Sequence, residues 1–174
     1  MNPPPPNAPP PEIPDFELLK RIGEGSYGEV WLARNLTGTF RAIKIVHRSA
    51  FESERPFERE FEGIKRFEPV SQMHESQLKI FHVGRRDGYF YYVMELADDA
   101  TGAADVTKLA SKSEISQSLR TSAATYSPKT LRSELQRCGR LPMAETLAIT
   151  LKLTQALAHL HGHGRAENRH CRRP

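Results

Sequence analysis

The sequence has few cysteines, no long apolar run and no signal peptide, which excludes several classes of protein. Its 174 residues include only two cysteines, Cys138 and Cys171, which lie far apart and have no CxxC partner. This favours neither a disulfide framework nor a zinc ribbon, and a reducing cytoplasm is the default location. No apolar run approaches the roughly twenty residues that a membrane span requires. The N-terminus also lacks the basic and apolar segments of a signal peptide. We therefore expect a cytoplasmic chain with no membrane partner.

Positive charge is too localised to indicate nucleic-acid binding. The formal net charge is +4, but four arginines and one glutamate in the last ten residues contribute +3 of it. The rest of the chain is nearly neutral and has no basic stripe interleaved with aromatic residues, so we expect no nucleic-acid partner. With 38% hydrophobic and 26% charged residues, the chain has the composition of one globular domain with a core.

Hydrophobic periodicity predicts the order strand, strand, strand, helix, strand, strand. Residues 16–35 and 40–46 alternate apolar with polar side chains, which favours strands. An amphipathic helix is predicted by the spacing of Phe57, Phe61, Ile64 and Phe67. Two further strands are predicted in 78–96, joined by a turn at Arg86-Asp87-Gly88.

The remaining segments divide by composition. Residues 1–15 are proline-rich and predict a stiff, disordered tail, for which a solubilising leader is favoured over a ligand of an SH3-like or WW-like groove. Residues 16–97 hold the predicted sheet and helix. The segment 98–127 is rich in Ser, Thr and Ala and predicts an insertion or linker, residues 128–163 predict two helices, and 164–174 form a basic tail.

Capping residues mark the two C-terminal helices. Ser127-Pro128 suits the start of the first, Gly139 suits its end, and Pro142 opens the second. We expect Gly162 and Gly164 to break the second helix. Alternate histidines at 159, 161 and 163 could gather a metal ion, but no cysteine or carboxylate joins them nearby, and a polar helix end is the favoured interpretation. We expect no metal site.

Three glycines form the pattern G-x-G-x-x-G-x-V in IGEGSYGEV. Gly23, Gly25 and Gly28 suit a turn whose backbone approaches a phosphate closely, because no Cβ stands in the way. A dinucleotide-binding site would need a helix directly after the glycines and an acidic residue about twenty positions on, and a P-loop would need Gly-Lys-Ser/Thr. The chain has neither: EVWLAR continues as a strand, and no Asp or Glu lies between Glu29 and Glu52.

A lysine follows in an apolar strand. Lys44, in AIKI, is unusual there because a buried ammonium needs an anion nearby. Glu60 lies three residues after Phe57 and four before Ile64, on the apolar face of the predicted helix, so a pair between Lys44 and Glu60 would satisfy both charges. The alternative is a solvated charge run that includes Glu60, formed by Glu58, Arg59, Glu60 and Glu62.

Residues 16–163 resemble the eukaryotic-type Ser/Thr protein kinases, because IGEGSYGEV, AIK, REFEGI and YYVMEL occur in that family's order and spacing. The resemblance implies an α+β fold: an antiparallel β-sheet N-lobe with one main helix, followed by two helices of a truncated α-helical C-lobe. It implies ATP as the ligand, with Lys44 contacting the α- and β-phosphates and Glu60 orienting it. The other positions that it implies for nucleotide contact are Ile22, Gly23, Gly25, Ser26, Gly28, Val30, Ala42, Met94, Glu95 and Ala97. Among these, Met94 would be the gatekeeper, and the backbone of Glu95 and Ala97 would bind the adenine edge.

The C-terminal residues depart from this family. RAENRHCRRP stands where a His-Arg-Asp segment is expected, and the last aspartate of the chain is Asp105. The catalytic Asp and the metal-binding Asp of the family pattern are therefore missing, so Mg²⁺, expected in a complete kinase, lacks its protein ligands. We expect an inactive kinase fragment that would act on a protein substrate only if the catalytic half were supplied. The alternative is a pseudokinase-like nucleotide-binding or interaction module.

Two further expectations concern the end of the chain. We hypothesise a changed reading frame or an interrupted domain close to Arg165. The last predicted helix carries leucines on more than one face, which predicts exposed apolar surface and self-association.

Overall fold

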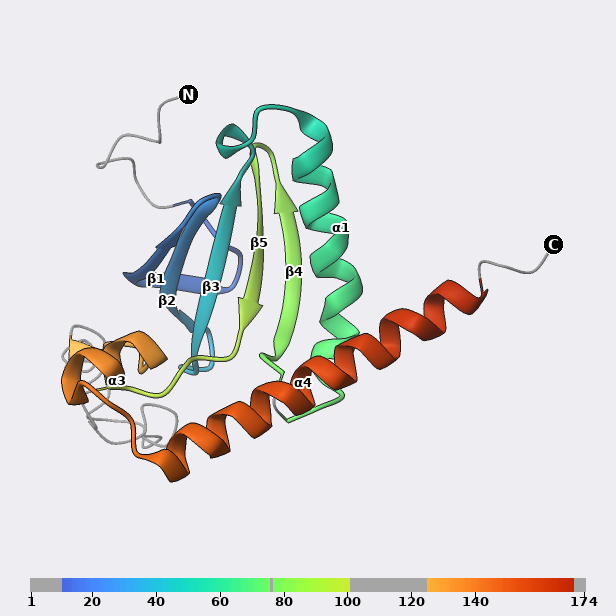
Figure 1. Cartoon of the computed structure of the whole chain (residues 1–174). Coiled ribbons are helices and arrows are strands. Elements are labelled where there is room, and N and C mark those ends of the chain that lie inside the picture. Colours follow the sequence, from blue (N-terminus) through green and yellow to red (C-terminus); the bar gives the residue numbers. More distant parts are fainter. Residues whose placement is uncertain (1–10, 76, 101–124, 171–174) are drawn as a thin grey trace.

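The computed structural model describes residues 11–75, 77–100 and 125–170, with 163–170 described as helical backbone only. The described strands form one antiparallel sheet in the order β1-β2-β3-β5-β4. Helix α1 (Glu54–Ser71) covers the β4 side of the sheet, and helices α3 (Leu131–Cys138) and α4 (Met143–His170) lie across one end of it (Figure 1). This is the α+β arrangement that the sequence predicts, and the predicted order of strands and helix is confirmed.

Short turns join β1 to β2, β2 to β3 and β4 to β5, whereas η1 (Arg48–Ala50) and α1 lie between β3 and β4. The strand bounds are Phe16–Gly25 for β1, Gly28–Asn35 for β2, Phe40–His47 for β3, Ile80–Arg86 for β4 and Tyr89–Met94 for β5. The turn between β4 and β5 contains Gly88 with φ of 80°, a conformation that glycine adopts without strain. The predicted turn at this point is confirmed.

Alternation along the strands builds a core on each face of the sheet. One face carries a buried cluster made of Ile13, Ala33, Ile43, Ile45, Tyr91 and Val93. The opposite face carries the α1 cluster, made of Val46, Phe51, Phe57, Ile80, Phe90 and Tyr92. Because successive residues of a strand point to opposite faces, Ile43 and Ile45 enter one core while Ala42, Lys44 and Val46 face the other way.

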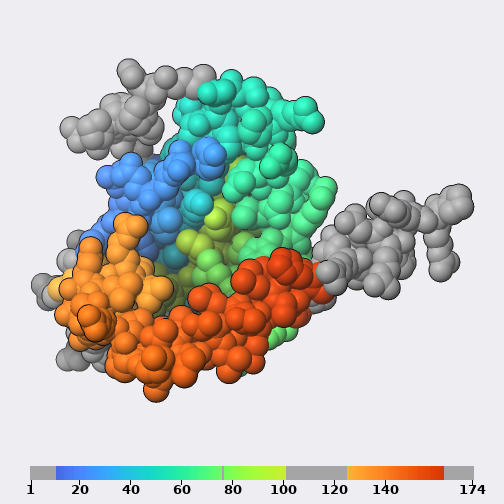
Figure 2. Space-filling model, viewed as in Figure 1, coloured from blue at the N-terminus to red at the C-terminus, as the bar shows by residue number. Residues whose placement is uncertain are grey.

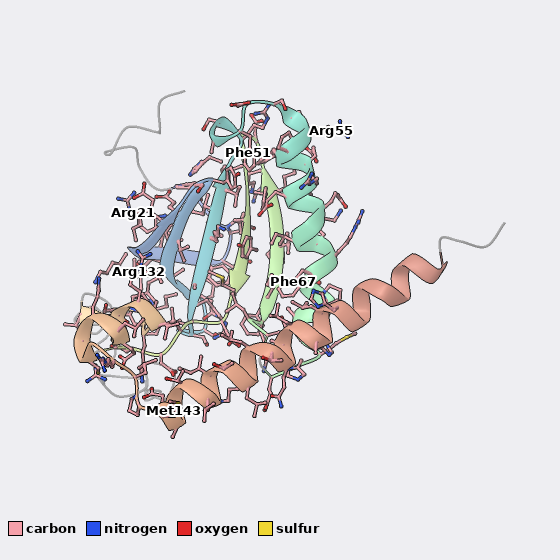
Figure 3. The ribbon with its side chains drawn as sticks, in the orientation of Figure 1. Arg21, Phe51, Arg55, Phe67, Arg132 and Met143 are labelled. Atoms are coloured by element: carbon pink, nitrogen blue, oxygen red, sulfur yellow. The ribbon has the colours of Figure 1, made fainter. Side chains whose placement is uncertain are left out.

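Helix α1, Glu54–Ser71, packs on the sheet as its periodicity predicts. Phe57 is 2% exposed, and Phe61, Ile64 and Phe67 pack against the same cluster. Figure 3 shows Phe67 on the side of α1 toward the sheet, Phe51 between the sheet and the start of α1, and Arg55 pointing away. A short 3-10 helix, η1 at Arg48–Ala50, leads from β3 into this region.

One end of helix α3 differs from the sequence prediction and the other agrees with it. Helix α3, Leu131–Cys138, begins after Thr130, whose hydroxyl caps the N–H of Ser133, so the predicted start at Ser127-Pro128 is wrong. Pro128 instead forms a β-bridge with Asp99, because this segment pairs with the chain that leaves the sheet. The predicted end at Gly139 is confirmed: its φ is 70° and its N–H bonds the carbonyl of Leu135.

Helix α4, Met143–His170, follows Pro142 directly. The expected break at Gly162 and Gly164 is wrong, because the helix passes through both positions. A helical glycine costs only about 1 kcal/mol relative to alanine and keeps its backbone hydrogen bond, so two glycines need not end a long helix. None of the described helices has both the length and the apolar character needed to cross a membrane.

The packed part of the chain begins before the predicted boundary at Phe16. Ile13 is 3% exposed and belongs to the first core, and the carbonyl of Glu12 accepts a hydrogen bond from the Tyr89 hydroxyl. The burial of Ile13 stabilises the packing of this segment against the sheet, because removing an apolar side chain from water lowers the free energy. Most of the predicted insertion, residues 101–124, lies outside the described residues.

Candidate nucleotide-binding site

The sheet register places four of the predicted site residues on one face. Val30 on β2 is paired with Lys44 on β3, and Ala42 on β3 is paired with Met94 on β5. Cross-strand partners point to the same face of an antiparallel sheet, as do residues i and i+2 of one strand. Val30, Ala42, Lys44 and Met94 therefore form one continuous patch.

This patch lies between two apolar clusters on the same face. The α1 cluster borders it at Met94 and Tyr92. The other border is the Tyr126 cluster, made of buried Leu32, Phe40 and Tyr126 with half-buried Leu19, Ile22 and Leu96 packed against it. Ile22, which the sequence predicts as a nucleotide contact, thus belongs to the border of the patch and not to its floor.

The three glycines of the motif have different local reasons to be glycine. None of them has a positive φ. A Cβ on Gly28 would lie 1.8 Å from the carbonyl oxygen of Ile45, so β3 itself requires glycine at that position. A Cβ on Gly23 or Gly25 would come no closer than 3.5 Å to any neighbour, which is ordinary contact. The fold therefore accounts for Gly28, but it leaves glycine at positions 23 and 25 without a packing reason.

Ser26 is exposed in the turn between β1 and β2, and Gly25 and Gly28 are paired across that turn. Gly25 is itself exposed, and Gly28 is half-buried. The turn joins the end of β1, which carries Ile22, to the start of β2, which carries Val30. It therefore lies at one end of the patch.

Lys44 and Glu60 are both half-buried, but no ion pair joins them within the described part of the chain. The Lys44 ammonium lies 5.8 Å from the ring centroid of Tyr92, its cross-strand neighbour, within range of a weak cation–π interaction. The Lys44–Glu60 pair stays a prediction.

A different carboxylate ties α1 to the sheet. Glu58 accepts two hydrogen bonds from Arg85 on β4, at 2.9 and 2.5 Å. The hydrogen bond from Arg85 lowers the pKa of the Glu58 carboxyl below its usual value. From the sequence, Glu58 is only one member of a charge run, because nothing in the sequence of α1 indicates which carboxylate faces an arginine on β4.

In the segment after β5, two backbone groups are hydrogen-bonded within the fold and two others are available. The N–H of Glu95 donates to the carbonyl of Lys79 at 3.0 Å, and the carbonyl of Ala97 accepts from the Tyr126 hydroxyl at 2.9 Å. Within the described residues, the carbonyl of Glu95 and the N–H of Ala97 have no hydrogen-bond partner. One acceptor and one donor therefore remain beside the patch.

Tyr126 is the site-bordering residue that sequence reasoning missed. It is 1% exposed, and its burial raises the pKa of the phenol to about 12. The only signal in the sequence is an aromatic residue at the end of a segment with little other apolar content. Its partners on β2 and β3 lie more than eighty residues earlier, so periodicity could not reveal the contact.

The described residues also line a cavity that includes none of the patch residues. A cavity between η1, the start of α1 and the β4–β5 turn is lined by Arg48, Glu54, Phe57, Arg85, Arg86, Asp87 and Gly88. Among the described residues, no three His, Cys, Asp or Glu side chains gather where they could hold a metal ion. The side chain of His163, one of the three alternate histidines, lies outside the described residues.

The chain is similar in sequence to several protein kinases over limited regions. It is 49% identical over 43 residues to the Serine/threonine-protein kinase RIM15 of Saccharomyces cerevisiae, covering 24% of this chain and 2% of that protein. It is 58% identical over 33 residues to the human Mitogen-activated protein kinase kinase kinase kinase 3, covering 18% of this chain and 4% of that protein.

The most extended of these alignments is with the Membrane-associated tyrosine- and threonine-specific cdc2-inhibitory kinase of Drosophila melanogaster, at 26% identity over 147 residues, covering 84% of this chain and 22% of that protein. The chain thus spans at most about a fifth of the length of these relatives. No family model matches the chain. The sheet, its helix and these alignments together identify a kinase-like domain, similar to the N-lobe of the eukaryotic-type Ser/Thr protein kinases.

Proposed function

We propose that this chain binds ATP on the patch formed by Val30, Ala42, Lys44 and Met94. The observation that carries the proposal is this patch itself: a half-buried lysine and three apolar side chains share one face of the sheet, between two packed clusters. An apolar surface beside one positive charge, the Lys44 ammonium, suits a ligand that is flat and apolar at one end and anionic at the other.

The phosphate end of the ligand would lie at the β1–β2 turn. Gly23 and Gly25 have no packing reason to be glycine, which supports a requirement set by something outside the fold. Backbone that approaches a phosphate closely is such a requirement. Ser26 and Gly28 complete this turn, and the Lys44 ammonium would meet the phosphate oxygens, with Glu60 orienting it if α1 brings them together.

The base end would lie against the segment after β5. The available carbonyl of Glu95 complements the amino group of adenine, and the available N–H of Ala97 complements its ring N1. Guanine presents the opposite order, an acceptor followed by a donor, so we expect ATP to bind more tightly than GTP. Ile22 and Ala42 would contact the ring from the sheet.

The chain alone is proposed to bind nucleotide without transferring its phosphoryl group. Phosphoryl transfer depends on positioning and on Mg²⁺, and no aspartate follows Asp105 to act as base or metal ligand. A protein substrate enters this proposal only if the catalytic half is supplied. The exposed free thiol of Cys138 supports a location in the reducing cytoplasm.

The direct test is equilibrium binding of ATP to the native chain and to Lys44→Ala. Loss of a charged partner of the phosphates should weaken ATP binding roughly 10-fold or more. Lys152→Ala, which removes an equal charge from exposed α4, is the matched control and should bind ATP like the native chain. Equal affinities of the native and Lys44→Ala chains would contradict the proposed site.

We further propose that α4 pairs with a second copy of this chain. Its exposed apolar side chains are Met143, Leu147, Leu151, Leu153 and Leu157, each 55–75% exposed. Only Glu145 and Lys152 are charged between residues 143 and 162, so little charge opposes self-contact. The helix forms a continuous band with α3 along one edge of the molecule (Figure 2). Apolar surface of this kind is typical of interaction sites.

Sedimentation at several protein concentrations tests the pairing. The native chain should shift toward a dimer as concentration rises, and a double change, Leu147→Gln with Leu151→Gln, should shift it back toward the monomer. A native chain that stays monomeric at all concentrations would overturn this second proposal and leave the nucleotide site unaffected.

A further inference from the structure

Tyr126 connects parts of the candidate site that are far apart in the sequence. Its backbone carbonyl accepts a hydrogen bond from Nζ of Lys20 on β1 at 2.9 Å. Its hydroxyl donates to the carbonyl of Ala97, beyond β5, at 2.9 Å. The ring is buried with Leu32 and Phe40 on β2 and β3. One residue therefore joins the first strand, the middle of the sheet and the segment that follows its last strand.

These contacts restrain the peptide group that the proposed base site would use. The N–H of Ala97 belongs to the peptide between Leu96 and Ala97. Leu96 packs in the Tyr126 cluster, and the carbonyl on the other side of Ala97 is held by the Tyr126 hydroxyl. The same side chain thus restrains the chain on both sides of this N–H. A donor that is ordered before its ligand arrives loses less conformational entropy on binding.

The position of Tyr126 does not depend on its hydroxyl alone. The neighbouring backbone pairs with the chain after β5: the N–H of Ala100 donates to the carbonyl of Ser127 at 2.8 Å, and the N–H of Lys129 donates to the carbonyl of Asp98 at 2.7 Å. This short ladder holds Tyr126 from its own side. Removing only the hydroxyl should therefore leave the ring in place while releasing Ala97.

We propose that Tyr126 is a positioning residue for nucleotide binding, whose hydroxyl holds Ala97 so that its N–H meets the base. The inference rests on the proposed ATP site and adds a residue to it that the kinase motifs of this sequence do not contain. It also predicts where the effect is felt: at the base, through Ala97, and not at the phosphates, which would be held by the β1–β2 turn and Lys44.

The test compares two ligands, ATP and inorganic triphosphate, on Tyr126→Phe. This variant keeps the ring and loses one hydrogen bond, so ATP affinity should fall roughly 3- to 10-fold. Triphosphate has no base, so its affinity should not change. Tyr91→Phe is the matched control: Tyr91 is also buried, at 4% exposure, but belongs to the core on the opposite face, so both affinities should stay native. Melting curves of all three proteins establish that each is folded at the temperature of measurement.

The outcomes separate this inference from the proposed function. If the native chain binds ATP and Tyr126→Phe binds it equally well, the positioning role is refuted and the site stands. If Tyr126→Phe loses triphosphate and ATP in equal proportion, the hydroxyl acts on the whole fold, and the role proposed for it is again refuted. A native chain that binds neither ligand overturns the proposed site, and the role of Tyr126 with it.

Discussion

Substituting alanine at Gly28 or at Gly25, two glycines of the same turn, should have very different consequences for the stability of the fold. At Gly28 the new Cβ would lie 1.8 Å from the Ile45 carbonyl oxygen, 2.9 Å from its carbon and 3.0 Å from the Val46 Cα. All three are backbone atoms of β3, so no side chain can rotate away. At Gly25 the nearest atom would be 3.9 Å away and φ is not positive, so alanine fits without strain.

The magnitudes follow from these contacts. Overpacking costs about 1–3 kcal/mol, and separating β2 from β3 would also weaken ladder hydrogen bonds worth about 1 kcal/mol each. Gly28→Ala should therefore lower the free energy of unfolding by about 3–4 kcal/mol. Gly25→Ala should change it by no more than about 0.5 kcal/mol, as substitutions free of such contacts do.

Urea unfolding measures both variants. Trp31 is the single tryptophan, lies on β2 and is half-buried, so its fluorescence reports this strand directly. A Gly28→Ala chain as stable as the native protein would refute the packing argument. Gly25→Ala should be stable yet bind ATP more weakly, because only the ligand needs glycine there; native affinity in this variant would count against the role proposed for the turn.

Two further predictions concern the cores. Phe57→Ala should lower the free energy of unfolding by about 3–5 kcal/mol, because a 2% exposed ring is removed from between α1 and the sheet; a loss below 1 kcal/mol in urea unfolding would mean that α1 is not packed as described. The raised pKa of Tyr126, about 12, means that the folded chain holds this proton more tightly than the unfolded chain, so stability should be lost as pH rises from about 10 to 12. The loss attributable to Tyr126 should reach about 2–3 kcal/mol and be absent in Tyr126→Phe, whereas identical pH profiles of the two proteins would contradict the burial of this phenol.

Much of the fold could be predicted from the sequence because its signals are local. The alternation in 40–46 and the helical spacing from Phe57 to Phe67 each depend on neighbours within one element. The order of elements then follows along the chain. The same local reasoning failed at the start of α3, where pairing of Pro128 with Asp99 displaced a favourable capping sequence, and at the expected glycine break in α4.

The candidate site was only partly accessible to such reasoning. Lys44 stands out as a charge in an apolar strand, and the register places it with Val30 and Ala42 as expected for a shared face. The packing reason for Gly28 could not be seen, because the contact comes from β3, seventeen residues later. Tyr126 could not be placed either, because long-range docking across an insertion leaves no periodic pattern.

Amide hydrogen exchange of the full chain with and without ATP tests the central claim most directly, because it locates the ligand without any substitution. We expect added protection in residues 22–30, 42–44 and 94–97, with the Ala97 amide among the most protected. Protection confined to another region, such as the cavity around Arg85, or no change at saturating ATP, would contradict the proposed nucleotide site.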